Sequence, residues 1–140
     1  MFVIVKINKT GEEMGNKSDK WIIVTGALII ALGGIHLLAT PVVLQMFPEL
    51  TTDKKLTFLF MYLAAGFGTI LPGFLIVFLK TEIENNNKKV IGVLKILSYY
   101  LLLFGISAVA TMWDNPFAYM TLIISGLYAV LIFKKGNSVR

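Results

Sequence analysis

Four long stretches of the chain contain no charged residue, and short polar or charged segments separate them. No Asp, Glu, Lys or Arg occurs within residues 21–48, 56–79, 96–113 and 115–133, and the shortest of these windows has 18 residues. An α-helix rises about 1.5 Å per residue, so roughly 20 apolar residues cross the ~30 Å hydrocarbon core of a bilayer. The pattern therefore predicts four transmembrane helices.

The predicted fold class is all-α, a four-helix transmembrane bundle. An N-terminal segment over residues 1–20 precedes a membrane domain over 21–133, and a tail over 134–140 follows it. The predicted spans cover about 21–44, 56–79, 91–112 and 117–133.

The start of the chain has two open interpretations. Residues 1–13 precede a second methionine, Met14, whose sequence MGNKSDKW would make an ordinary start for a small membrane protein. Either Met1 begins the protein, or residues 1–13 are an extension that is dispensable for the fold.

Basic residues are distributed unevenly between the segments that flank the spans. Of the 13 Lys and Arg residues, 11 lie in the N-terminal segment, between the second and third spans, in the first turn of the third span, or in the tail. The other two, Lys54 and Lys55, lie between the first and second spans. Cytoplasmic segments of membrane proteins carry the excess of positive charge. Both termini are therefore predicted to be cytoplasmic. The loops are rich in Lys, Asn and Ile, which is typical of a bacterial protein encoded in AT-rich DNA, so the predicted location is the inner membrane of a bacterium.

A short internal similarity relates the first span to the third. Residues 34–40 (GIHLLAT) match residues 105–111 (GISAVAT) at Gly, Ile, Ala and Thr, and a shorter Phe-x-Tyr match opens the second and fourth spans. One interpretation is a pair of parallel-repeated helical hairpins; the other is chance similarity between apolar sequences. The repeat would make His36 equivalent to Ser107 and Tyr62 to Tyr119.

The candidate site is a group of polar residues near the outer ends of the spans. His36, the only histidine, lies about 10 Å below the outer end of the first span. An imidazole at this depth either contacts a ligand or handles protons, or it is a neutral side chain that bridges two helices. Asp114 either lines the mouth of a pocket or caps the fourth helix. The predicted ligand-binding residues are His36, Tyr62, Ser107, Thr111, Tyr119 and Asp114.

Several functions are disfavoured by what the sequence lacks. The chain has no cysteine, so disulfides and iron–sulfur clusters are excluded, and one histidine without an intramembrane carboxylate cannot complete a metal or haem site in a monomer. We predict no cofactor and no catalytic residue. The basic residues flank spans, so we predict contact with the lipid bilayer and no binding of nucleic acid.

Three functions remain open. The first is a non-enzymatic accessory or small-ligand or lipid-binding protein, with an outward-facing polar pocket around His36, that assembles with other membrane subunits or with itself. The second is a small oligomeric transporter or channel. The third is a membrane enzyme that acts on a lipid or quinone-like substrate, with His36 as general acid or base.

The span pattern, together with GGIHLLATP (residues 33–41) and WDNPFAY (residues 113–119), resembles the DoxX-like group of small bacterial membrane proteins. The resemblance covers residues 21–133. It implies an accessory role in membrane redox complexes and transfers no catalytic residue. Many members of that group carry an arginine early in the first span, whereas apolar residues follow Trp21 here.

Overall fold

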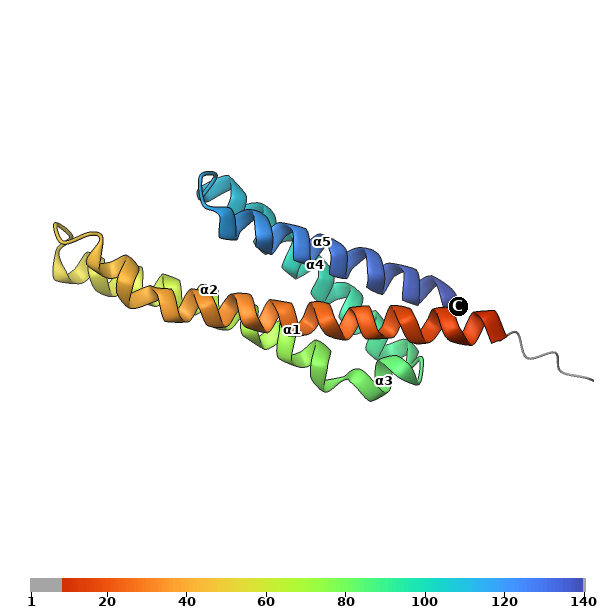
Figure 1. The fold of residues 1–140 in the computed structure, drawn as a ribbon. Helices are drawn as coiled ribbons and strands as arrows, with labels where there is room; N and C mark the ends of the chain where they lie inside the picture. The colour runs from red at the N-terminus through yellow and green to blue at the C-terminus, as the bar shows by residue number, and fades with distance from the viewer. Residues whose placement is uncertain (1–8, 140) are drawn as a thin grey trace, which may run out of the picture.

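The computed structural model describes residues 9–139, with side chains placed for residues 17–139. All regular structure in these residues is helical, as Figure 1 shows. Four of the helices are long and apolar enough to cross a membrane, which confirms the all-α, four-helix architecture. The first eight residues of the predicted N-terminal segment and Arg140 lie outside the described residues. The helices are α1 (Lys9–Gln45), α2 (Thr52–Phe78), α3 (Lys80–Glu84), α4 (Lys88–Thr111) and α5 (Pro116–Ser138).

The first and last long helices extend past the predicted spans. α1 has 37 residues, so it is about 55 Å long, and it begins within the segment predicted to precede the membrane domain. α5 runs on to Ser138, through Lys134 and Lys135 of the predicted tail. Hydropathy places the end of a span at its first charged residue, but Lys and Glu are good helix formers. The helices therefore continue beyond the apolar windows.

α1 and α2 form a hairpin whose backbones approach closely at paired glycines. A Cβ atom added at Gly73 would lie 2.7 Å from the carbonyl oxygen of Gly26. Nearer the turn of the hairpin, a Cβ atom added at Gly33 would lie 2.8 Å from the carbonyl oxygen of Gly66. Only residues without a side chain fit such contacts, and small residues are the usual means by which membrane helices pack closely.

α4 and α5 form a second hairpin, and Asn115 defines its turn. The Asn115 side-chain oxygen accepts a hydrogen bond of 2.9 Å from the backbone amide of Phe117, and Pro116 occupies the first position of α5. An Asn cap followed by Pro is a common way to start a helix. Asp114, the other candidate for this role, is exposed and makes no capping bond among the described residues.

The connection between the hairpins is more structured than its polar sequence suggests. α3 turns Ile83 into the core, where its side chain is fully buried. Asn86 then adopts a positive φ of 57°, a conformation that Asn tolerates better than most residues. Asn87 caps α4 and donates a 2.7 Å hydrogen bond to the Glu82 carboxylate. The asparagine run thus forms a defined turn.

The hydrophobic core lies in one half of the molecule, toward α3 and the C-terminal end of α5. Its fully or nearly fully buried residues come from all five helices: Ile22, Ile29, Ile76, Ile83, Ile91, Leu94, Leu101, Tyr128 and Ile132. The Tyr128 hydroxyl donates a hydrogen bond of 3.2 Å to the backbone oxygen of Leu94 within this core. The same half therefore holds most of the tight contacts between the two hairpins.

A buried ion pair joins α1 to α5 at this end. The Lys135 ammonium lies 2.6 Å and 2.8 Å from the two carboxylate oxygens of Asp19, and both side chains are more than 90% buried. Sequence analysis had assigned these residues to a terminal segment and a tail. Their helical spacing explains the burial: Lys135 lies three and seven residues after the buried Ile132 and Tyr128, on the same face of α5.

Toward the other end the two hairpins diverge, as Figure 1 shows. α1 packs against α5, whereas α2 and α4 meet over only a short stretch. Within that stretch the Tyr100 hydroxyl donates a 3.0 Å hydrogen bond to the backbone oxygen of Gly68. The molecule is therefore a wedge that is packed at the α3 end and open between the two hairpin turns.

Candidate functional site

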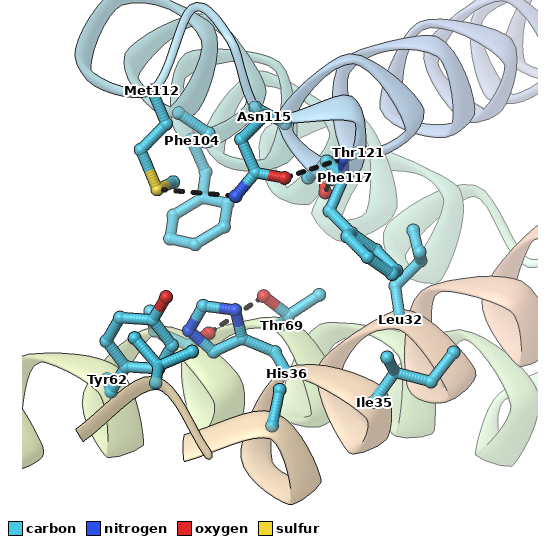
Figure 2. Close-up of a pocket in the computed structure, with 15 residues that line it drawn as sticks. Leu32, Ile35, His36, Tyr62, Thr69, Phe104, Met112, Asn115, Phe117 and Thr121 are labelled. Carbon is cyan, nitrogen blue, oxygen red and sulfur yellow. Dashed lines mark hydrogen bonds between the residues drawn. The ribbon is translucent and has the colours of Figure 1, made fainter. Parts of the chain in front are cut away.

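A cavity of about 200 Å³ lies in the open half of the wedge. The hydrophobic core is confined to the other, packed half. Figure 2 shows its two walls, one from each hairpin. The α1–α2 wall includes Leu32, Ile35, His36, Ala39, Tyr62, Ala65 and Thr69. The α4–α5 wall includes Phe104, Ala108, Met112, Asn115, Phe117, Ala118 and Thr121. The cavity is larger than the ~150 Å³ apolar cavity that holds a benzene molecule.

His36 is held on the cavity wall by aromatic stacking. Its ring lies 4.4 Å from that of Tyr62 at an angle of 10°, and Tyr62 in turn stacks on Phe58 at 4.9 Å. The Nε2 atom is buried and has no hydrogen-bond partner in the described part of the chain. A buried polar atom that is left unsatisfied is uncommon and costs free energy. Since Nε2 is buried, the other atoms of the ring are the ones that line the cavity.

Asn115 brings an amide to the opposite wall (Figure 2). Its oxygen is used by the cap of α5, and its nitrogen lies 3.9 Å from the sulfur of Met112. A thioether is a weak acceptor. The amide N–H groups therefore keep most of their capacity to donate to a bound group.

The two threonines of the cavity make their hydrogen bonds within their own helices. The Thr69 hydroxyl donates to the backbone oxygen of Ala65 at 2.8 Å, and the Thr121 hydroxyl donates to that of Phe117 at 2.8 Å. Such bonds are usual for threonine in membrane helices. Both oxygens can still accept a hydrogen bond, but neither hydroxyl offers a free proton.

The cavity holds no formal charge. No Asp, Glu, Lys or Arg is among the residues that line it. Among the described residues, no three His, Cys, Asp or Glu side chains come together as metal ligands. The site is thus an apolar pocket with a few neutral hydrogen-bonding groups, which is the general character of small-molecule sites in proteins.

The structure brings together two of the six residues predicted to form the site. His36 and Tyr62 line the cavity and touch each other. The other four are exposed and do not line it: Ser107, Thr111, Asp114 and Tyr119.

Hydrogen bonds to the backbone account for two of these four side chains. The Thr111 hydroxyl donates to the backbone oxygen of Ser107 at 2.8 Å, and the Tyr119 hydroxyl donates to that of Trp113 at 2.7 Å. Ser107 faces outward although the repeat would make it equivalent to His36. The two hairpins therefore present different faces to the space between them.

Several residues that line the cavity are not among the predicted site residues. One of them, Thr69, could have been predicted from helical spacing. Thr69 lies seven residues after Tyr62, so both occupy one face of α2 two turns apart. Asn115 caps α5, and it also lies on the cavity wall because the two hairpins face each other there. In the sequence, nothing distinguishes Phe104 and Phe117 from phenylalanines that face lipid.

Comparison with known proteins supplies no relative. No protein-family model matches the chain, and neither the curated proteins nor the solved structures contain a match to it.

Proposed function

We propose that this protein is a multi-pass membrane protein that binds a small molecule or lipid between its two helical hairpins, at His36, as a non-enzymatic binding or accessory protein. The observation that carries the proposal is the cavity of about 200 Å³ between the two hairpins, with His36 on its wall. Densely packed proteins contain few voids of this size.

The position of the cavity supports a site reached from the outer side or from the bilayer. The cavity lies toward the turns at residues 46–51 and 112–115, away from the lysine-rich connection and tail. By the positive-inside rule those turns face outward and both termini are cytoplasmic. The polar groups of the site are then within a few turns of the outer surface.

The surroundings of His36 favour binding over catalysis. General acid–base catalysis by histidine needs a partner that orients the imidazole, usually through the second ring nitrogen. Here the ring is positioned by stacking on Tyr62, and no carboxylate lines the cavity. The imidazole can recognise a hydrogen-bonding group without any further machinery.

Filling the cavity tests the proposal. In Ala39→Phe the new ring occupies the cavity, whereas Ala27→Phe places the same ring on an exposed face of α1. We expect small molecules extracted from purified wild-type protein and from Ala27→Phe to include a species enriched over bulk lipid, as detected by mass spectrometry. Ala39→Phe should lose that species. Identical extracts from all three proteins would refute a binding cavity.

His36 itself is tested by a substitution that keeps its packing. His36→Phe retains a ring that can stack on Tyr62 but removes Nε2. We expect His36→Phe to keep the thermal stability of the wild type and to bind the enriched species more weakly. Unchanged retention in His36→Phe would show that the imidazole does not contact the bound molecule.

A further inference from the structure

The chemistry of the cavity walls restricts what the proposed site can hold. No residue that lines the cavity carries a fixed charge. Asp114, the acidic residue of the nearby turn, is exposed and outside the lining. A charged group moved into an apolar cavity without a counter-charge loses its hydration and gains nothing in return.

His36 is the one lining group that could become charged. Its ring is stacked on Tyr62, and no carboxylate on either wall could stabilise an imidazolium. A neutral imidazole offers one donor and one acceptor. The site therefore favours a hydrogen-bonding group over an anion or a cation.

The number of free hydrogen-bonding groups indicates a small polar head. The imidazole of His36 lines one wall, and on the other wall the amide nitrogen of Asn115 has only a sulfur atom near it. The hydroxyls of Thr69 and Thr121 are engaged with their own helices. One hydroxyl or carbonyl on the bound molecule would give the Asn115 amide an acceptor.

The rest of the bound molecule must be apolar and can extend out of the cavity. Most of the lining is apolar, including Leu32, Ile35 and Phe104. On the α2–α4 side the hairpins diverge (Figure 1), and these two helices contact each other over only a short stretch near Tyr100. In a membrane this side faces lipid tails. A chain too long for about 200 Å³ can continue there.

From these features we infer that the ligand is an uncharged amphiphile from the bilayer, with one small hydrogen-bonding head that lies between His36 and Asn115. The inference rests on the proposed binding function. It excludes phospholipids, detergents and metabolites whose head is charged.

Three photoreactive probes with the same alkyl chain test this inference. Each carries a diazirine and an alkyne, and the heads are a primary alcohol, a sulfate and a trimethylammonium group, the last two charged at every working pH. The full-length protein is illuminated with each probe in liposomes, and labelled peptides are mapped by mass spectrometry. Labelling of cavity segments 32–43 and 104–121 is divided by labelling of the lipid-facing segment 56–61, which corrects for partition into the bilayer.

We expect the alcohol probe to label the cavity segments about tenfold more than either charged probe, since about one hydrogen bond and the loss of hydration separate them. His36→Phe should reduce the alcohol's labelling and Ala39→Phe should abolish it, with Ala27→Phe unchanged. Preferential labelling by a charged probe, or equal labelling by all three, that Ala39→Phe still blocks would overturn the ligand class and leave the binding function standing. Labelling that Ala39→Phe does not reduce would overturn both.

Discussion

Asp19 and Lys135 lie 116 residues apart in the chain, yet both carboxylate oxygens of Asp19 are within 2.8 Å of the Lys135 ammonium. The pair is buried between the N-terminal part of α1 and the last turns of α5. A buried ion pair adds little net stability over an apolar pair of similar size, but removal of one partner leaves an uncompensated charge. The packed end of the wedge therefore depends on both residues together.

The first prediction concerns this pair. Lys135→Met leaves the buried Asp19 carboxylate without a counter-charge and should lower the free energy of unfolding by about 3–5 kcal/mol. The double variant Asp19→Leu/Lys135→Met removes both charges and should recover most of that loss. Thermal unfolding in detergent, followed by size-exclusion chromatography, measures both effects. Lys80→Met is a matched control, because Lys80 and Glu84 form an exposed pair at 3.9 Å. A single variant as stable as the control would contradict the structural role of the buried pair.

The second prediction concerns the glycines between α1 and α2. Gly73→Ala should lower stability by about 1–3 kcal/mol because its methyl group would meet the Gly26 carbonyl oxygen. Gly92→Ala on α4 is the matched control, since a Cβ atom there meets nothing within 4 Å and alanine is the better helix former. Thermal unfolding should place Gly73→Ala below the wild type and Gly92→Ala at or above it. The reverse order would show that the α1–α2 contact is looser than described.

The third prediction separates two neighbouring residues of the second hairpin turn. Asn115→Ala removes the cap of α5 and should cost about 0.5–2 kcal/mol. Asp114→Ala changes an exposed side chain that makes no capping bond, so its unfolding temperature should match the wild type. If Asp114→Ala proves the more damaging of the two, the cap has been assigned to the wrong residue.

The fourth prediction concerns orientation across the membrane. The chain has no cysteine, so a single cysteine can be introduced without background. A membrane-impermeant maleimide should label Asp114→Cys in intact cells and Asn86→Cys only after the membrane is opened, because the lysine-rich side is expected to be cytoplasmic. Labelling of Asn86→Cys in intact cells would reverse the proposed topology.

Local sequence pattern predicted the four long helices but not how the hairpins are arranged. Hydropathy locates apolar windows, and each window became a helix. The same signal treated Lys135 as a tail residue, because a hydropathy window carries no information on the helix face that a charge occupies. Helical spacing from Tyr128 and Ile132 does carry that information.

The candidate site could be predicted only in part, because the residues of its second wall depend on how the two hairpins are arranged. His36 and Tyr62 stand out in the sequence as an intramembrane imidazole and a tyrosine at nearly the same depth. Which residues face them depends on the angle between two hairpins, and that angle results from contacts far away in the packed half. Ser107 illustrates this: its sequence context resembles that of His36, yet its side chain is exposed.

The wedge shape also acts as a lever. Asp19 and His36 are 17 residues apart on one continuous helix, a distance of about 25 Å. Since the glycine contacts bind α1 and α2 into one stiff unit, a rotation of about 5° at the ion pair would move the cavity wall by about 2 Å. The position of the cavity wall therefore depends on contacts about 25 Å away along α1, at the ion pair.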